Sequence, residues 1–237
     1  MKTKLSVFSL IVVLALLLSA CGVAGTQTPA RTMTVNGSGQ IYLKPDIAYI
    51  YVGVHTENVS AASAVAENNT KTARLVEALT GFGVAAEDVR TTNFSIWPSQ
   101  QFTPEGQPME TKYMVDNTVY VTVRDLSKLG DMLDGAVKAG ANSINSITFD
   151  VADKTQAMSD ARKAAVAAAK KQAEELASAA GVSLVNVQSI QYFDSMPVPV
   201  FEGKGMGGGA MAADVAVPIN PGQLQLTATV TLTYEIR

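Results

Sequence analysis

The sequence predicts an α+β fold in which a mainly antiparallel sheet packs with about three helices. Several segments alternate polar and apolar residues, which is typical of strands with one wet face. Other segments repeat apolar residues at helical spacing. In chain order the segments form a strand, then a β-α-β-β-α-β unit, and finally α-β-β. The middle unit has the connectivity of a ferredoxin-like fold.

Residues 1–20 carry the features of a secretory signal peptide. Lys2 and Lys4 precede an uncharged apolar run over residues 7–18, and two small residues follow before Cys21. The run is shorter than the roughly 20 apolar residues that a membrane-spanning helix needs. We therefore expect the mature chain to be exported.

Cys21 is the single cysteine of the chain. The stretch "LSAC" at 18–21 resembles the bacterial lipobox, in which cleavage occurs before a cysteine that becomes acylated. Acyl chains on Cys21 would anchor the protein to a membrane, with residues 21–31 as a tether reaching about 30 Å. Gly22 differs from the Asp that retains many lipoproteins in the inner membrane, which favours the outer membrane or the outer face of the cell membrane. A plain export signal is the alternative, and it would leave Cys21 as an odd reactive thiol.

The charge balance argues against a nucleic-acid partner. Removal of residues 1–20 takes Lys2 and Lys4 from 18 basic residues and leaves 16 against 21 acidic ones, a net charge near −5. Nucleic-acid binding needs a clustered basic surface, which the sequence does not show. With one cysteine, a monomer forms no disulfide, so the fold over residues 32–237 depends on its apolar core.

The elements expected from the start of this domain follow one another closely. Gly37 and Gly39 indicate a turn between two short strands within residues 32–46. Ser60 is placed to cap a helix that runs to about Thr80. The inner face of that helix is predicted to carry Val65, Thr72, Val76 and Leu79. Further strands are expected at 47–57, 88–98, 113–123 and 143–151, with a polar hairpin connection at 99–110 and a short helix starting at Asp125.

The clearest helix is predicted from Asp153 to Ala180. Met158, Leu176 and a series of alanines form a small-residue stripe along it, and Gly181 is suited to end it. Such a stripe allows close packing either on the protein's own sheet or on a second copy. Strands are expected at 184–193 and 223–236. The Gly-, Pro- and Met-rich segment 194–222 between them fits no element, and it could serve as an arm for self-association.

The sequence shows no catalytic centre, cofactor site or metal site. His55 is the only histidine, and it reads as a strand residue near the end of a sheet, without an orienting partner that could make it a base. Trp97, beside Pro98, is predicted to be a core residue at a strand end. The loop methionines Met196, Met206 and Met211 could offer thioethers to Cu(I), but they read better as packing or mobile residues. The stretch "GKGMGGGAMAAD" lacks the order of a phosphate-binding loop.

Several motifs in order resemble the SIMPL-domain family over residues 32–237. They are the Gly-x-Gly motif before Pro45-Asp46, the strand 91–98, the step Arg124-Asp125-Leu126, the alanine-rich helix 161–180, and Pro221-Gly222 before the last strand. The resemblance implies a non-enzymatic bacterial envelope protein, with links to oxidative stress and assembly into oligomers. It supplies no catalytic residues. The lipobox is a departure from the family, since many members are simply secreted.

Two classes of function follow from these observations. The first is a self-associating structural or interaction protein displayed on a membrane, with an envelope partner that the sequence does not identify. The second is a ligand-binding lipoprotein of the solute-receptor type. The second is less favoured because such receptors usually have two lobes built from repeated β-α-β units, which are missing from the predicted order.

Overall fold

The computed structural model describes residues 30–200 and 219–237, and it confirms the α+β class. These residues form three α-helices and eight strands, with short 3₁₀ turns at Ala86–Asp88 and Leu126–Lys128. The strands are β1 (Thr32–Leu43), β2 (Ile47–Asn58), β3 (Val89–Ser99), β4 (Lys112–Val123), β5 (Ser143–Asp150), β6 (Leu184–Asp194), β7 (Val198–Val200) and β8 (Gln223–Ile236). The helices are α2 (Ala61–Gly81), α3 (Leu129–Ala139) and α4 (Thr155–Ala180).

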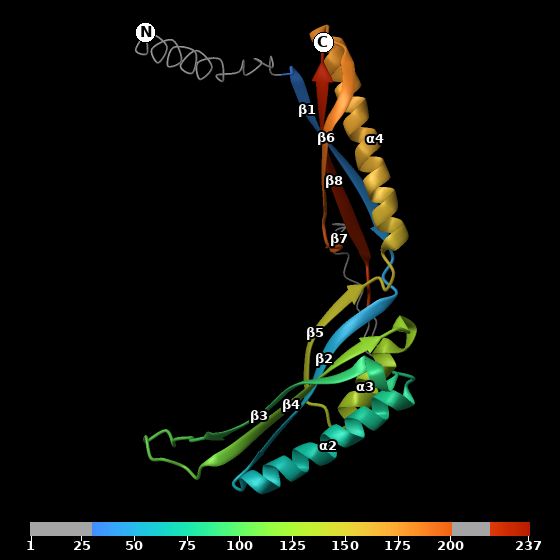
Figure 1. The fold of residues 1–237 in the computed structure, drawn as a ribbon. Helices are drawn as coiled ribbons and strands as arrows, with labels where there is room; N and C mark the ends of the chain where they lie inside the picture. Colours follow the sequence, from blue (N-terminus) through green and yellow to red (C-terminus); the bar gives the residue numbers. More distant parts are fainter. Residues whose placement is uncertain (1–29, 201–218) are drawn as a thin grey trace, which may run out of the picture.

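The strands divide into two antiparallel sheets, a division that the sequence did not reveal. One sheet, with the order β3-β4-β2-β5, packs with α2 and α3 and is called the central lobe here. The other has the order β1-β8-β6, with β7 also on β8; together with α4 it is called the terminal lobe. Figure 1 shows the two lobes end to end in an elongated molecule.

The central lobe has the predicted ferredoxin-like arrangement. Its strands and helices follow the order β2-α2-β3-β4-α3-β5, and the sheet order places β4 and β2 in the middle. Both helices lie on one face of the sheet (Figure 1). Large apolar side chains fill the space between the layers, among them Ile50, Leu75, Leu79, Leu129 and Met132. Among the described elements, no helix or strand covers the opposite face of this sheet, which is called the open face here; one uncovered face is common in antiparallel sheets.

The predicted turn at Gly37 and Gly39 is wrong, because both glycines lie inside the continuous strand β1. Helix α4 crosses β1 at these two positions. A Cβ atom on Gly37 would lie 2.1 Å from the carbonyl oxygen of Ala165, and one on Gly39 would lie 2.1 Å from that of Ala161. The glycines therefore permit close contact between helix and strand backbones, which is a role that glycine has in strands as well as in turns.

The small-residue stripe of α4 packs on the protein's own sheet. Ala161, Ala165, Ala169 and Ala173 are fully buried between the helix and strands β1 and β8. Of the two partners that the sequence left open for this stripe, the protein's own sheet is therefore the one that it contacts, and the stripe is not available to a second copy. Leu176, which we placed on the stripe, is instead 45% exposed. The helix itself matches the prediction closely, and it ends at Gly181 in the left-handed conformation.

Two chain segments connect the lobes, and Asp46 ties them together. The backbone N–H of Asp46 donates to the carbonyl of Asp150 at 3.1 Å, and its side chain accepts from the N–H of Ala152 at 2.8 Å. Ile219, on the segment that leads into β8, packs against the core of the central lobe. The central lobe is thus one continuous stretch of chain, whereas the terminal lobe joins the two ends of the domain.

Part of the segment 194–222 forms regular structure after all. Its residues Val198–Val200 are strand β7, which pairs with Gln223, Leu224 and Gln225 at the start of β8. Residues 201–218, which include Met206, Met211 and most of the proposed arm, lie outside the described residues. So do the signal peptide, Cys21 and nearly all of the tether. In the described part of the chain, no helix combines the length and apolarity required to cross a membrane.

Candidate functional site on the open face of the central sheet

A row of polar side chains crosses the open face of the central sheet near one end. Strand register places Asp116 of β4 between His55 of β2 and Ser95 of β3. Residues that pair across antiparallel strands point to the same face, so all three lie on the side away from α2 and α3. The three residues are up to 61 positions apart along the chain, and the register of the strands brings them together.

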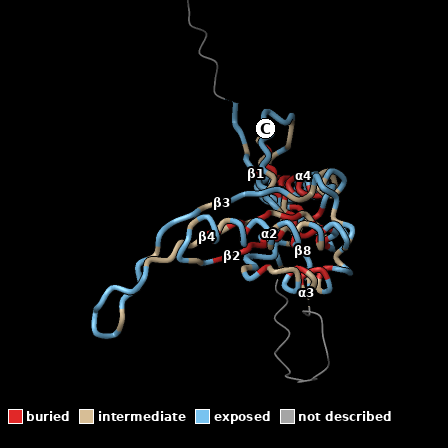
Figure 2. The backbone as a smooth tube through the Cα atoms, turned by 90° about the horizontal axis from the view of Figure 1, so that it is seen from below, coloured by how far each residue is buried: buried red, intermediate tan, exposed pale blue. Residues whose placement is uncertain are grey.

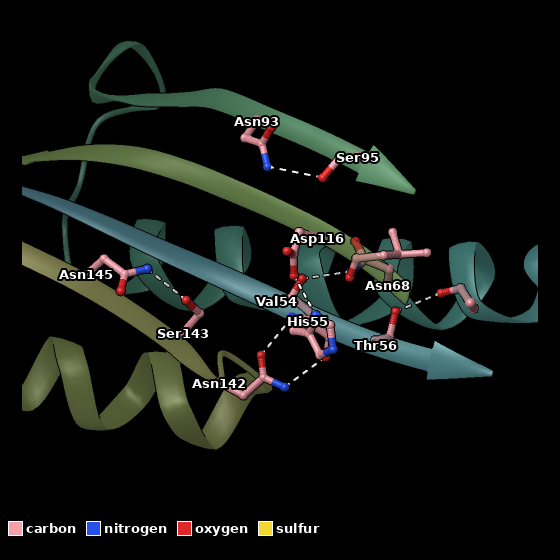
Figure 3. A network of polar contacts seen from close by, with 12 residues as sticks. Val54, His55, Thr56, Asn68, Asn93, Ser95, Asp116, Asn142, Ser143 and Asn145 are labelled. Atoms are coloured by element: carbon pink, nitrogen blue, oxygen red, sulfur yellow. Dashed lines mark hydrogen bonds and ion pairs between the residues drawn. The ribbon is translucent and has the colours of Figure 1, made fainter. Parts of the chain in front are cut away.

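His55 is oriented by two neighbours. Its Nδ1 atom lies 2.6 Å from the Oδ1 atom of Asp116, and each of the two side chains is a little over one-third exposed. The side-chain amide of Asn142 bonds the backbone of His55, accepting from its N–H at 2.7 Å and donating to its carbonyl at 2.8 Å. Asn142 precedes β5, so its side chain continues the hydrogen-bond ladder beyond the start of that strand (Figure 3).

A buried asparagine supports this row from the helix side. Asn68 of α2 is fully buried, and its Nδ2 atom donates to the carbonyls of Val54 at 2.8 Å and Val115 at 3.2 Å. These carbonyls immediately precede His55 and Asp116 in the chain, so Asn68 holds the two strands where the pair sits (Figure 3). Asn68 occupies the inner face of α2, together with Ala64, Leu75 and Leu79. The buried face of α2 therefore differs from the predicted one. Of the four residues predicted to face inward, only Leu79 is fully buried.

The order of the row limits its chemistry. In a Ser-His-Asp triad the histidine lies between the other two residues. Here Asp116 lies between, so His55 has no contact with Ser95 through which it could activate the hydroxyl. Within residues 30–200 and 219–237, no group of three or more His, Cys, Asp or Glu side chains is arranged to hold a metal ion.

An ion pair between Lys112 and Glu57 borders the row. The Nζ atom of Lys112 lies 2.8 Å from the Oε1 atom of Glu57, and this hydrogen bond, followed by the attraction of the two charges, lowers the pKa of Glu57. Trp97 lies on the same face of β3, with its ring centroid 6.4 Å from that of His55. The prediction that Trp97 is a core residue is wrong, since it is 37% exposed. Trp97 lies near the end of β3, in the outer part of the β3–β4 hairpin. This long hairpin extends away from the helices (Figure 2).

Three tyrosines form a cluster on the open face toward the other end of the sheet. The rings of Tyr49 and Tyr120 stack with centroids 5.5 Å apart, and Tyr51 meets Tyr120 edge-on at 5.0 Å. The guanidinium carbon of Arg90 lies 5.4 Å from the Tyr120 ring centroid. Burial raises the pKa of the Tyr120 hydroxyl, and the neighbouring Tyr49 and Tyr51 raise it further. Sequence reasoning missed this cluster because its members come from different strands.

Comparison with known proteins identifies relatives along nearly the whole domain. A family model described as "SIMPL: Protein of unknown function (DUF541)" matches residues 33–234. The 26 kDa periplasmic immunogenic protein of Brucella melitensis is 30% identical over 218 residues, which cover 90% of this chain and 87% of the relative. Uncharacterized proteins YggE are also similar. The one from Edwardsiella ictaluri is 30% identical and covers 80% of each chain, and the one from Escherichia coli K12 is 31% identical and covers 72% of each.

The family match agrees with the resemblance found in the sequence. It spans both lobes, from the start of β1 to the end of β8, so the division into two sheets lies within one family domain. The family description and the names of the relatives assign no reaction. The chain belongs to the SIMPL family.

Proposed function

We propose that the mature chain is a non-enzymatic, lipid-anchored protein of the cell envelope. We further propose that it self-associates, and that its structural or interaction role is linked to envelope or oxidative stress. The name of the Brucella relative places that protein in the periplasm, which supports export of this one. The lipobox supports an anchor at Cys21. Because β1 begins at Thr32, the tether would lead directly into an edge strand of the terminal sheet.

The observation that carries self-association is the apolar edge strand β6. It pairs with β8 on one side only, and its other edge is free within the described residues. Ile190, Tyr192 and Phe193 are 62%, 65% and 72% exposed. An exposed apolar edge strand is a template for pairing with another chain, and soluble proteins normally protect such edges. Coverage of this edge by a second copy would remove both its unpaired backbone groups and its apolar side chains from water.

Self-association can be tested with the mature chain lacking its lipid, residues 22–237. We expect an oligomer in size exclusion with light scattering, and we expect Ile190→Lys to reduce its size because a charge on the edge opposes strand pairing. Val137→Lys is the matched control, since Val137 is a similarly exposed apolar residue, at 53%, on α3 of the other lobe. A full chain that stays monomeric at high concentration contradicts the proposal. An oligomer whose size is unchanged by Ile190→Lys would show that the interface does not include β6.

The lipid anchor has its own test. In the producing bacterium, Cys21→Ser is expected to release a folded protein from the membrane fraction, because the acyl chains would be the only attachment. Circular dichroism of the released protein is expected to match that of the mature domain. Retention of the variant in the membrane fraction contradicts the assignment, as does a wild-type mature mass that lacks acyl chains.

The non-enzymatic role is supported by the geometry around His55. The imidazole faces Asp116 and the indole of Trp97, and the row offers no serine or cysteine that it could activate. We expect His55→Gln to leave any stress phenotype of the wild-type protein unchanged. Loss of that phenotype with unaltered stability would assign a catalytic or binding role to His55.

A ligand-binding role is the second candidate, and a cavity at the junction of the lobes favours it. The cavity has a volume of about 520 Å³ and is lined by Phe149, Met158, Met196 and Pro197, with the ion pair of Lys154 and Asp150 at its side. Mostly apolar pockets of this size at domain junctions commonly bind small molecules. A thermal-shift screen against small solutes tests this role, and a shift that is lost in Met158→Lys would support it.

A further inference from the structure

The open face of the central sheet carries exposed aromatic rings at two places. The tyrosine cluster of Tyr49, Tyr51 and Tyr120 lies at one, and Trp97 beside His55 lies at the other. Trp97 pairs with Met114 on β4, six residues from Tyr120, so the two places are about 20 Å apart along the strand. This separation matches the length of several linked sugar rings better than that of a single small molecule.

The rings of the tyrosine cluster are held in fixed positions. Tyr120 contacts both neighbours at 5.0 and 5.5 Å between centroids, and Arg90 lies over its ring. Tyr51 is nevertheless 40% exposed. An aromatic side chain with a rigid apolar face and a polar tip contributes contact area at a low cost in conformational entropy. The cluster is therefore suited to stack on the apolar face of a ligand and to hydrogen-bond its edge.

Residues with small polar side chains separate the two aromatic places. Gly53 lies between Tyr51 and His55 on the open face of β2 and has no side chain. A Cβ atom there would lie 3.1 Å from the Oγ1 atom of Thr118 and 3.4 Å from the Cβ atom of Ser143. The side chains of Thr118 and Ser143 thus cover Gly53 and place hydroxyl groups between the two aromatic places. Polar groups of this kind exchange hydrogen bonds with hydroxyl or amide groups of a ligand.

The charges on this face indicate a neutral ligand. Asp116 is hydrogen-bonded to His55, Glu57 forms an ion pair with Lys112, and Arg90 lies over the Tyr120 ring. The whole chain carries a formal charge of −3. A four-stranded sheet with exposed aromatic residues can also stack nucleic-acid bases, but polyanions require a basic footprint that this protein lacks. The paired charges and negative total thus disfavour both nucleic acids and acidic polymers.

We propose that the open face of the central sheet binds an extended, neutral polysaccharide. Sugar rings stack on the tyrosine cluster and on Trp97, and the chain between them passes over Gly53 and its neighbours. Thr118 and Ser143 contact its hydroxyl or amide groups. This surface lies in the central lobe and does not include β6, so its test is independent of the proposed self-association.

The test uses the unlipidated mature chain, residues 22–237, with chitohexaose and cellohexaose as neutral probes. Trp97 is the only tryptophan, so its fluorescence reports contact at one end of the site. We expect at least one probe to bind in calorimetry and to change the Trp97 emission. Tyr51→Ala is expected to weaken the affinity about tenfold, and Thr118→Val, which keeps the shape but removes a hydroxyl, about fivefold.

Matched controls separate the site from general effects on the sheet. Phe94→Ala changes an exposed aromatic residue of β3 on the opposite face, and Tyr42→Ala changes an exposed tyrosine of the terminal lobe. Both are expected to leave the affinity within about twofold. Thermal unfolding of every variant shows whether a loss of binding reflects a loss of fold, and Thr118→Val serves as the second probe of the site if Tyr51→Ala is unfolded.

Three results would overturn the proposal. The first is the absence of binding to either neutral probe. The second is tighter binding of polygalacturonate or of a single-stranded oligonucleotide, which would make the face a site for anionic polymers. The third is binding that leaves the Trp97 emission unchanged or that Phe94→Ala weakens as much as Tyr51→Ala does, which would place the ligand elsewhere.

Discussion

Both lobes pack helices on a sheet, but the side chains between helix and sheet are small in the terminal lobe and large in the central lobe. In the terminal lobe, α4 contacts β1 through alanines and glycines, and the backbones themselves are close. In the central lobe, leucine, isoleucine and methionine side chains keep helices and sheet apart, and one buried asparagine bonds across the gap. The first kind of interface has no room for an added atom. The second has room to adjust its packing, but it depends on a specific hydrogen bond.

Gly37→Ala is expected to have the largest effect, because it adds a methyl group where the helix backbone already lies. The new Cβ atom would be 2.1 Å from the carbonyl oxygen of Ala165 and 2.4 Å from the amide nitrogen of Ala169. Backbone atoms cannot turn aside as a flexible side chain can, so we expect a loss of about 3 kcal/mol or more in the free energy of unfolding. Urea unfolding followed by circular dichroism measures it.

Gly81→Ala is the control for this variant. Gly81 is the last residue of α2, and a Cβ atom there has no neighbour within 4 Å. We expect no loss and a gain of up to about 1 kcal/mol from the reduced entropy of the unfolded chain. Since Trp97 is in the central lobe, its fluorescence shows whether Gly37→Ala unfolds the terminal lobe alone. Equal stability of the two variants would contradict the close contact of α4 with β1.

Asn68→Ala is expected to cost about 2 kcal/mol, because it removes the donor to the carbonyls of Val54 and Val115 and leaves a cavity. The loss should be visible in the unfolding transition that Trp97 reports. The control is Asn69→Ala, the adjacent and exposed residue of α2, which should change the stability by less than about 0.5 kcal/mol. If both variants behave alike, Asn68 does not hold β2 and β4 together.

Arg162→Lys tests the surface of the terminal lobe and should have a smaller effect. Arg162 of α4 bonds the carboxylate of Asp194 through two of its nitrogens, and its guanidinium carbon lies 5.3 Å from the Tyr192 ring centroid. Lysine keeps the charge but loses the paired geometry and most of the stacking, so a loss of about 1 kcal/mol is expected. Lys163→Ala, at a more exposed pair with Asp160, should be near neutral. If Arg162→Lys leaves the free energy of unfolding unchanged, Arg162 does not hold β6 to α4.

The fold class and most elements could be predicted from the sequence because they depend on local patterns. Alternation defines β4 and β8, and Ser60 caps α2 by accepting from the N–H of Ser63. The turn predicted at Gly37 and Gly39 failed because glycine has two uses. It permits turns, and it also permits close backbone contact, and only the position of α4 distinguishes the two. The division into two sheets likewise depends on long-range pairing between β1 and β8.

The candidate site was harder to predict than the fold. His55 could be placed on a strand, but its partner Asp116 follows from the register of β2 against β4, which no local signal specifies. Trp97 was predicted to be a core residue, but it is exposed on the edge strand β3, as is the nearby Phe94. Cys21 can be assigned only by its motif, since it lies outside the described residues.

Tyr120→Phe is expected to have the smallest effect, and it tests the environment of the open face. Burial, followed by the proximity of Tyr49 and Tyr51, raises the pKa of Tyr120 above its usual value of 10.0. A late-ionising component is therefore expected when tyrosinate absorbance is followed against pH, and it should vanish in Tyr120→Phe. Above about pH 10 the unfolded chain releases this proton first, so the free energy of unfolding should fall as the pH rises, and Tyr120→Phe should reduce that slope. Tyr42→Phe, on β1 of the terminal lobe, should leave the late component in place. If the late component survives in Tyr120→Phe, it belongs to another tyrosine, and the burial of the Tyr120 hydroxyl within the tyrosine cluster would be contradicted.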